Sequence, residues 1–372
     1  MSTTRILTGI DLPAAPSCGS MILVADAYRA MPEVHTTFLT MPPVDPAWHH
    51  PFDELVALRV AKQPYGDPAF DTYVAGLTAE VEDLINRHRP DVIHAQHLGF
   101  GLSPAFARAA DRIPVISVAH GTDVIAADHV EQARVAMTEV VAASTFVIAP
   151  NSTLAEHIDR LTEHRYTGRL TVVPWGIPVA EALVRHRPRS STGPLSLLHA
   201  GRLDENKSTI TAIEALALTS QPHRLTVIGS GPELSHLIKR AHDLGVHGRV
   251  AFEPFLPREE LWRRFRDFDT FVFTTAELEA FGLVAIEAQA HGLPVVYSNL
   301  PGMNTTLGQA GSPYTPGDPA SLAAAIDQMA HDTHWRDALA RAGLDNARRY
   351  DITTTADLLA TLTARAIAAV RT

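Results

Sequence analysis

Two glutamates, Glu279 and Glu287, flank a Phe-Gly pair in the segment TTAELEAFGLVAIEAQAHGLPVV, residues 274–296. The Ala-rich run after that pair ends at Gly292, a pattern typical of a helix with glycine just beyond its last turn. Glu279 would then precede the helix, and Glu287 would lie a full turn inside it on the face of Leu283. This spacing disfavours a side-by-side acid/base pair. It fits two carboxylates that contact different groups of an extended ligand. The alternative is that Glu279 is merely favoured by the helix dipole and that Glu287 is an exposed residue of the helix.

Two cations, Arg202 and Lys207, lie five residues apart in HAGRLDENKS, between a strand pattern and a helix pattern. Arginine supplies a planar fork and lysine a point charge, so together they could hold a diphosphate and stabilise its departure. The alternative is a solvated loop in which Asp204 or Glu205 pairs with them. Because charged loops are common, spacing alone favours that alternative.

Glycines and histidines mark the ends of other strand patterns. Gly229 and Gly231 in VIGSGPE would let a backbone approach a nucleotide, although strand-to-helix turns use glycine anyway. His120 in SVAHGTDV ends a strand of the first half and could donate to a hydroxyl or phosphate oxygen. The alternative is a histidine satisfied by local backbone, and we prefer that interpretation for His94 and His97.

Composition excludes several function classes. The formal net charge of -10, without a long run of Lys and Arg, argues against nucleic-acid binding. The single cysteine, Cys18, excludes an internal disulfide, and no His or carboxylate spacing is typical of a metal site, so we predict no metal. No apolar run reaches about 18 residues and the N-terminus does not read as a signal peptide, which predicts a cytoplasmic protein that does not cross a membrane.

Short β-rich runs alternate with helical patterns along the chain, which predicts parallel sheets with crossover helices. The runs are RILTGI, VHTTFLT, DVIHAQ, PVISVAH, TFVIAP, LTVVPW, LSLLHAG, RLTVIGSG, RVAFEPF, TFVFTT and LPVVYS. A Pro-, Ser- and Arg-rich stretch at about 184–198 interrupts the alternation and divides it into two similar α/β halves. We therefore expect two Rossmann-like domains, residues 1–185 and 186–350, facing across a cleft. Residues 351–372 are expected to form a helix that packs back on the first domain. Ligands should bind at the carboxyl ends of the strands, in that cleft.

Five of these motifs occur in the order that is found in retaining glycosyltransferases of family 4. The chain resembles that family in HGTD, VVPWGI (172–177), GRLDENKS, VIGSGPE and ELEAFGLVAIEAQAHGLPVV. The resemblance covers nearly all of the second half and the strand ends of the first. It implies the GT-B fold, in which residues 1–185 would bind the acceptor and residues 186–350 the nucleotide sugar.

The resemblance carries roles over to single residues. Glu279 would lie beside the hydroxyl groups of the donor sugar, and Glu287 on the ribose of the nucleotide. Arg202 and Lys207 would clamp the donor diphosphate, and His120 would lie near the donor sugar and the reacting centre.

Further donor contacts follow from the same resemblance. In the family a Gly-Gly pair after the first strand lies against the diphosphate, and this chain has Cys18-Gly19-Ser20 there. The implied donor-binding positions are Gly19, Gly229, Gly231, Phe281, Gly282 and Leu283.

The resemblance implies transfer of a hexose-type sugar, with retention of configuration, from a nucleoside diphosphate to an acceptor hydroxyl. The donor nucleotide would be uridine diphosphate, the family's commonest, and no cofactor is expected. A segment such as SMILVADAYRAM has only Arg29 as a cation, which favours a soluble small-molecule acceptor over a membrane lipid. The acidic chain suits a cationic acceptor, such as an aminocyclitol or aminoglycoside precursor in antibiotic biosynthesis. A sugar-nucleotide epimerase and a non-catalytic nucleotide-sugar-binding partner subunit are the alternatives, and the sequence does not indicate an oligomeric state.

Overall fold

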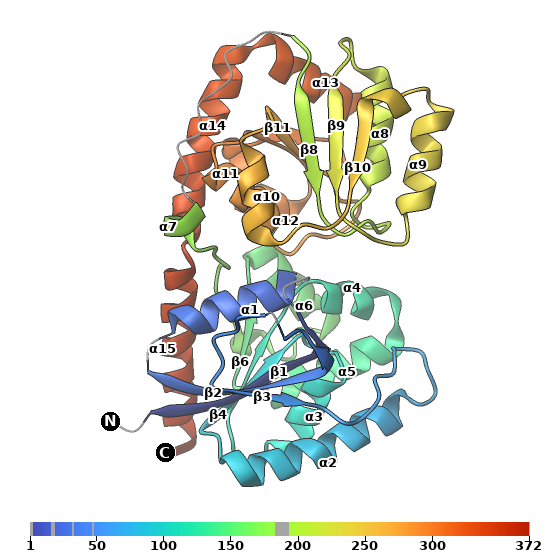
Figure 1. The fold of residues 1–372 in the computed structure, drawn as a ribbon. Coiled ribbons are helices and arrows are strands. Elements are labelled where there is room, and N and C mark those ends of the chain that lie inside the picture. The colour runs from blue at the N-terminus through green and yellow to red at the C-terminus, as the bar shows by residue number, and fades with distance from the viewer. Residues whose placement is uncertain (1–2, 16–18, 32, 47, 183–192, 372) are drawn as a thin grey trace. The chain divides into compact units, whose positions relative to one another are not determined.

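The computed structural model describes residues 3–15, 19–31, 33–46, 48–182 and 193–371. The chain divides into two compact units: unit 1 consists of Met1–Gly176 and Ile352–Thr372, and unit 2 of Ile177–Asp351. Each unit contains a parallel sheet with helices on both of its faces (Figure 1). The predicted α/β class and the two Rossmann-like halves are confirmed.

The sheet of unit 1 has, among the described residues, seven parallel strands in the order β3-β2-β1-β4-β5-β6-β7. Strand β1 lies between β2 and β4, so the direction of strand addition reverses there. The strands are β1 (Thr4–Ala14), β2 (Val34–Val44), β3 (Glu54–Ala57), β4 (Val92–Gln96), β5 (Val115–Val118), β6 (Phe146–Ala149) and β7 (Leu170–Val172).

Alternate residues of the strands in unit 1 point to opposite faces of the sheet, as expected for a strand that is buried on both sides. Leu7 of β1 packs in a cluster with residues of α2, α3 and α5, whereas Ile6 packs in a cluster with residues of α1 and α15. The helices are α1 (Gly19–Ala30), α2 (Phe70–His88), α3 (Leu102–Ala109), α4 (Thr122–His129), α5 (Glu131–Ala143), α6 (Ser152–Leu161) and α15 (Ile352–Arg371), with a short 3-10 turn at Thr167–Arg169.

The C-terminal helix α15 is fastened to unit 1 by a buried polar relay. The hydroxyl of Tyr28 on α1 lies 2.6 Å from His94 Nδ1 on β4, and His94 Nε2 lies 3.0 Å from the hydroxyl of Thr363 on α15. Thr363 in turn donates to the carbonyl of Leu359. His94 is therefore a satisfied core histidine, but its partners are side chains of α1 and α15 and not the local backbone that the sequence interpretation favours. Residues 352–372 belong to the same unit as α1.

Replacing Thr363 with valine should destabilise unit 1 because it leaves the buried Nε2 of His94 without its partner. We expect the free energy of unfolding to fall by about 1–3 kcal/mol, measured by urea denaturation. The matched control is Thr361→Val, since Thr361 lies on the exposed side of the same helix and donates only to Asp357 O. Equal losses in the two variants would contradict the role of the relay.

The sheet of unit 2 has six parallel strands among the described residues, in the order β10-β9-β8-β11-β12-β13. Here β8 lies between β9 and β11 and marks the reversal. The strands are β8 (Ser196–Ala200), β9 (Arg224–Ile228), β10 (Val250–Glu253), β11 (Thr270–Phe273), β12 (Val295–Ser298) and β13 (Ser312–Tyr314).

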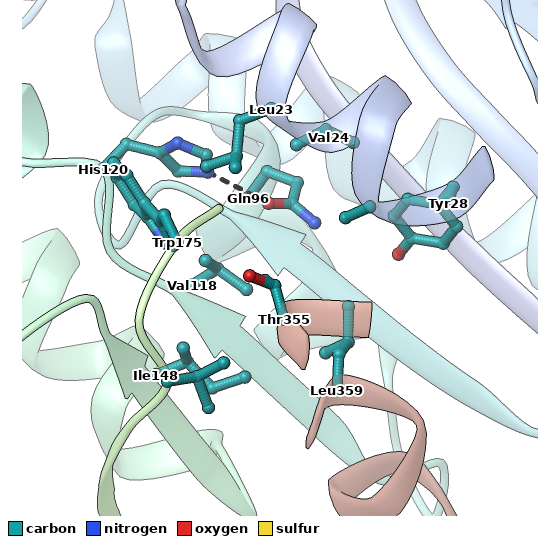
Figure 2. Close-up of a pocket in the computed structure, with 12 residues that line it drawn as sticks. Leu23, Val24, Tyr28, Gln96, Val118, His120, Ile148, Trp175, Thr355 and Leu359 are labelled. Carbon is teal, nitrogen blue, oxygen red and sulfur yellow. Dashed lines mark hydrogen bonds between the residues drawn. The ribbon is translucent and has the colours of Figure 1, made fainter. Parts of the chain in front are cut away.

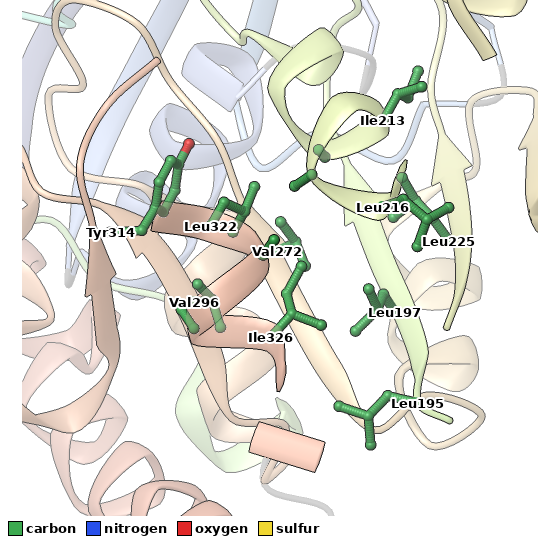
Figure 3. Close-up of a cluster of buried hydrophobic side chains, with 14 of the residues drawn as sticks. Leu195, Leu197, Ile213, Leu216, Leu225, Val272, Val296, Tyr314, Leu322 and Ile326 are labelled. Atoms are coloured by element: carbon green, nitrogen blue, oxygen red, sulfur yellow. The ribbon is translucent and has the colours of Figure 1, made fainter. Parts of the chain in front are cut away.

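One face of the sheet in unit 2 packs against α8, α9 and α13 through a cluster of aliphatic side chains. Figure 3 shows Leu197, Val272 and Val296 of three strands meeting Ile213 and Ile326 of two helices. On the other face, Phe271 of β11 meets Phe265 of α10 edge-on. The helices are α7 (Val179–Ala182), α8 (Thr209–Leu218), α9 (Leu234–Asp243), α10 (Arg258–Phe265), α11 (Leu283–Ala290), α12 (Pro301–Thr306), α13 (Pro319–His331) and α14 (Thr333–Ala347), with 3-10 turns at His247–Arg249, Gly308–Ala310 and Arg348–Tyr350.

The structure divides the chain between Gly176 and Ile177, ahead of the predicted boundary at 185/186. The reason is local bonding: the Ile177 N–H donates to Tyr350 O, Ile177 bridges to Asp351, and α7 contacts α11. The second division lies after Asp351 instead of after residue 350. Most of the stretch taken as a linker, 184–198, lies outside the described residues, and its last three residues begin β8.

None of the helices among the described residues combines the length and apolar character that a membrane span requires.

Candidate functional site

The site in unit 2 is built on the two loops that follow β8 and β11, the neighbouring strands at the point where strand order reverses. In an open parallel sheet that point is the expected ligand position. The loop after β8 carries Arg202 and Lys207, and the loop after β11 carries Glu279. The topology therefore brings together residues that lie far apart in the sequence.

The loop after β8 is folded around the carboxylate of Asp204. Asp204 accepts from the Lys207 N–H at 3.0 Å and from Arg202 Nε at 2.5 Å. The side chain of Arg202 is 66% exposed, so it can leave this partner at little cost. The alternative in which Asp204 pairs with a cation of this loop is thus correct for Arg202, in the absence of a ligand.

Lys207 and Glu279 form the central ion pair of the site. Lys207 Nζ donates to Glu279 Oε2 at 2.6 Å, and the two side chains are only 27% and 13% exposed. The other carboxylate oxygen of Glu279 accepts from the Gly282 N–H at 3.2 Å, just before α11 begins. The carboxylate of Glu279 thus connects Lys207, in the loop after β8, with the backbone just before α11, in the loop after β11.

Asn206 fastens the two loops together, a role that spacing in the sequence does not reveal. Its side-chain Nδ2 donates to Leu278 O at 3.0 Å, and its Oδ1 accepts from the Glu277 N–H at 3.2 Å. Its carbonyl accepts from the Ala276 N–H at 2.7 Å. These three hydrogen bonds hold the backbone just before Glu279 against the loop that carries Lys207. They therefore keep the side chains of Glu279 and Lys207 close to each other.

The helix α11 begins next to a glycine whose left-handed backbone conformation strains any other residue. Gly282 has a φ of +77°, and a Cβ at this position would lie 2.8 Å from Cε of Met303. Phe281 is buried edge-on against Tyr350, so its side chain anchors the turn and faces the core. A ligand at the start of α11 would therefore meet backbone N–H groups, including those near Leu283, and not the phenyl ring of Phe281.

Glu287 lies one turn inside α11, as predicted, and it is buried, so the alternative of an exposed helical glutamate is wrong. Its carbonyl accepts from both the backbone N–H and Nδ1 of His291. A contact of its carboxylate with a ribose stays a prediction.

Gly229 and Gly231 pack directly on the loop that carries Arg202. A Cβ on Gly229 would meet the carbonyl oxygen of Gly201, and a Cβ on Gly231 would lie 2.2 Å from the carbonyl oxygen of Leu203. Both neighbours are backbone atoms, which cannot swing aside. These glycines act first by letting two loops touch, and the donor contact that the resemblance implies for them stays a prediction.

Replacing Gly231 with alanine should disturb the site without touching a charged residue. We expect the displaced backbone of Leu203 to lower the free energy of unfolding by about 1–3 kcal/mol, as overpacking does, and to weaken nucleotide binding about tenfold or more. Urea denaturation and calorimetry with UDP measure the two effects. Gly248→Ala is the control, because a Cβ there meets nothing within 4 Å. Unchanged UDP affinity in a destabilised Gly231→Ala protein would contradict the link between this turn and the site.

In unit 1, His120 follows β5 and is held by two side chains. His120 Nε2 lies 3.0 Å from Gln96 Oε1, an acceptor, so Nε2 carries the proton; the His120 N–H donates to the carboxylate of Asp123. Burial lowers the pKa of the imidazole to about 3, which keeps it neutral. Nδ1 is buried without a hydrogen-bond partner and is left as an acceptor.

His97 is not the locally satisfied histidine that the sequence interpretation favours. Its ring stacks between Phe100, at 4.1 Å, and His120, at 4.2 Å between centroids, and neither ring nitrogen has a hydrogen-bond partner. Its backbone φ of +67° turns the chain so that its N–H bonds Val118 O. The sequence gives no signal for this, because the partners come from neighbouring strands.

A small cavity of about 30 Å³ lies beside His120 in unit 1. Figure 2 shows it between α1, the ends of the central strands and the start of α15, with Gln96, Trp175 and Thr355 on its walls. Its lining is mostly apolar, and it has room for about one or two water molecules.

The structure gives no steric reason for glycine at position 19. Gly19 is the first residue of α1, and a Cβ there would meet nothing within 4 Å. Cys18 lies outside the described residues. The predicted contact of Gly19 with a diphosphate stays a prediction.

No group of three or more His, Cys, Asp or Glu side chains that could hold a metal ion occurs in the described part of the chain.

Comparison with known proteins gives consistent matches for both halves. Residues 28–181 match the family model described as Glycosyltransferase Family 4, and residues 180–345 the model described as Glycosyl transferases group 1. Glycogen synthase of Mycobacterium tuberculosis is 33% identical over 282 residues, covering 72% of this chain and 67% of that protein. D-inositol 3-phosphate glycosyltransferase of Frankia alni is 30% identical over 316 residues, covering 76% and 77%. The structure of Anabaena Alr3699/HepE in complex with UDP-glucose has a TM-score of 0.81 at 20% identity, covering 97% of this chain and 99% of that one.

Proposed function

The chain belongs to glycosyltransferase family 4, with the GT-B fold, and we propose that it moves a hexosyl group from a nucleoside diphosphate to a hydroxyl group of a small soluble acceptor, with retention of configuration. The single observation that carries this proposal is the Lys207–Glu279 pair beside the start of α11. It joins a cation suited to phosphate and a carboxylate suited to sugar hydroxyls at the strand ends where a nucleotide sugar would lie.

The reaction needs charge stabilisation above all. The bond between the anomeric carbon and the diphosphate oxygen breaks, and the diphosphate leaves with the electron pair. Lys207, the exposed and movable Arg202 and the N–H groups at the start of α11 would stabilise that charge without a metal ion. The acceptor oxygen forms the new bond to the anomeric carbon, and its proton passes to the departing phosphate oxygen.

Glu279 would orient the sugar in this scheme. It already accepts from Lys207 and from the Gly282 N–H, which fixes the carboxylate in place. A carboxylate with two donors is a weak nucleophile, so a covalent glycosyl-enzyme is disfavoured. His120, neutral and with its Nε2–H held by Gln96, would accept a hydrogen bond at Nδ1 from a substrate hydroxyl and would transfer no proton.

Three acceptor classes are to be tested, two from the names of the relatives and one from the charge of the chain. Their names describe a glycogen synthase and an inositol phosphate glycosyltransferase, and the acidic chain suits an aminocyclitol or aminoglycoside precursor. For the donor we propose uridine diphosphate as the nucleotide and a hexose as the sugar.

The test is a screen of UDP-, ADP- and GDP-glucose against maltooligosaccharides, inositol phosphate, glucose and 2-deoxystreptamine. The proposal expects nucleotide release that depends on an acceptor, with a glycosylated product detected by mass spectrometry and an α-anomeric proton by NMR. An isomerised donor without product would favour an epimerase. Binding of a donor without turnover on any acceptor would favour a non-catalytic partner subunit.

A further inference from the structure

Asp11 carries a buried carboxylate oxygen that has no hydrogen-bond partner among the residues that the structure describes. The residue lies near the end of β1 and is 1% exposed. Its Oδ2 accepts from the hydroxyl of Tyr73 at 2.9 Å, whereas Oδ1 has no partner. A buried polar atom left unpaired costs about 1–3 kcal/mol, and more for a charged group, so native structures retain few of them without a reason.

Other buried polar atoms of unit 1 also have no partner among the described residues. Both ring nitrogens of His97, Nδ1 of His120 and the hydroxyl of Tyr65 are likewise buried without a partner. Phe100 connects them, because its ring packs on His97 and lies 6.2 Å from the ring of Tyr65. We call these residues, with Asp11, Lys62 and Tyr73, the Asp11 cluster. It lies in unit 1 at the strand where the order of addition reverses, the expected ligand position.

Lys62, which supplies the ammonium group of the Asp11 cluster, is already paired with Asp11. Lys62 Nζ donates to the carbonyl of Asp11 at 2.6 Å, lies 3.8 Å from Asp11 Oδ2, and sits 4.8 Å from the centre of the Phe100 ring. Asp123, buried beside His97, accepts from the Leu98 N–H at 2.6 Å. Two carboxylates against one ammonium leave the surroundings negative when both are ionised.

The tyrosines respond to that charge. Burial raises the pKa of Tyr65 most, and the charges of Asp11 and Asp123 raise it further. The pKa of Tyr73 is raised by burial and then by Asp11. Both hydroxyls therefore stay protonated and can act as donors or acceptors.

We propose that the Asp11 cluster is the part of the protein that selects the acceptor, binding an unphosphorylated polyol or amino-polyol through Asp11 Oδ1 and His97. The proposal rests on the proposed function and names its acceptor class. A hydroxyl or ammonium group donates to the unpaired carboxylate oxygen, and further hydroxyls meet the ring nitrogens of His97. A phosphate group on the acceptor would lie near the negative charges of Asp11 and Asp123. Because Lys62 is already paired with Asp11, like-charge repulsion would disfavour a phosphorylated acceptor. A buried water could fill the same positions, which would make the cluster structural only.

The experiment compares matched acceptors and separates binding from turnover. The probes are glucose with glucose 6-phosphate, myo-inositol with its monophosphate, and glucosamine with glucosamine 6-phosphate. Binding to the full-length protein is measured by saturation-transfer NMR, and kcat/KM with UDP-glucose is measured where turnover occurs. For at least one pair we expect the unphosphorylated member to be preferred about tenfold or more. Preference for the phosphorylated member, or binding of none of the six, would overturn the proposal.

Asp11→Asn tests the residue itself, because the amide keeps the shape and an acceptor for Tyr73 but removes the charge. We expect the preference to shrink about tenfold, mainly through the KM of the acceptor, with UDP affinity unchanged. Asp53→Asn is the control, since Asp53 is a half-exposed carboxylate of the same unit that accepts from the Thr36 N–H. A lower stability of Asp11→Asn with an unchanged acceptor preference would assign the cluster to a structural water and overturn the proposal. If UDP does not bind and no nucleotide sugar reacts, the proposed function fails, while the NMR comparison still decides the selectivity of the Asp11 cluster.

Discussion

Replacing Lys207 with alanine is expected to lower turnover about 100-fold or more, while the protein stays folded. Loss of one preorganised donor to a developing anion costs enzymes that much in general. Here the loss is reinforced, because Glu279 would keep its negative charge at a largely buried position after its 2.6 Å partner is gone. That charge would then repel the departing diphosphate. Nucleotide release with UDP-glucose and the best acceptor of the screen, at saturating concentrations, measures the effect.

Three variants separate this role from general damage to unit 2. Lys207→Arg keeps a cation and should recover part of the turnover, although its fork does not reproduce the point charge. Arg202→Ala should cost less than Lys207→Ala, because Arg202 is mostly exposed and must move to reach a phosphate. Lys239→Ala removes an exposed cation that pairs with Asp243 four residues on, and should change nothing. Turnover of Lys207→Ala close to that of the unmodified protein would refute the assignment.

The α/β architecture could be predicted from the sequence because buried parallel strands give continuous apolar runs. The long or fully buried strands, such as β4 and β11, all correspond to runs that the pattern reveals. The two strands that escaped prediction are β3, whose four residues are all partly or fully exposed, and β13, which has only three residues and includes Pro313. Short edge strands have neither the length nor the alternation on which the pattern depends.

The candidate site was predictable where a motif is contiguous and unpredictable where partners come from different strands. The positions of Glu279 before α11 and Glu287 inside it followed from helix spacing alone. The direct bond between Lys207 and Glu279 did not, because it depends on β8 and β11 being neighbours in the sheet. Asp11 and Asn206 gave no signal, since an aspartate in a strand or an asparagine in a loop is ordinary until its neighbours are known.

Acid should unfold this protein unusually early, because several of its histidines are buried in the neutral form. Burial lowers the pKa of His94 and of His120 to about 3, and lowers that of His199 to about 4, whereas an ordinary histidine has a pKa of about 6.5. His94 is enclosed by the relay to α15, and His199 lies between Val272 O and the hydroxyl of Thr209. In the unfolded chain all three titrate near 6.5, so between that pH and about 3–4 the unfolded state binds protons that the folded state does not.

The sign of the effect follows from this difference in bound protons. The stabilising contribution of each histidine is complete above pH 6.5 and is lost progressively as the pH falls from there toward the folded-state pKa. Each contributes a slope of about 1.4 kcal/mol per pH unit, so the two in unit 1 give about 3 kcal/mol per unit well below pH 6.5, and the one in unit 2 gives about 1.4 kcal/mol per unit. Asp123 opposes the trend, because burial raises its pKa and protonation then favours the folded state. Since a typical domain has only about 5–15 kcal/mol of stability, cooperative unfolding is expected before pH 4.

Urea denaturation at pH 7.5, 6.5, 5.5 and 5.0 measures the slope for the two units. Unit 1 contains His94 and His120 and unit 2 contains His199, so a probe of unit 1 should report the steeper loss. His94→Gln provides the control, because an amide can still meet Tyr28 and Thr363 but does not titrate. That variant should be less stable than the unmodified protein at pH 7.5. Its free energy of unfolding should depend less steeply on pH, by about 1.4 kcal/mol per pH unit, because one titrating group is gone. Equal denaturation midpoints at pH 7.5 and 5.0 would show that these imidazoles take up protons in the folded state, contrary to their burial.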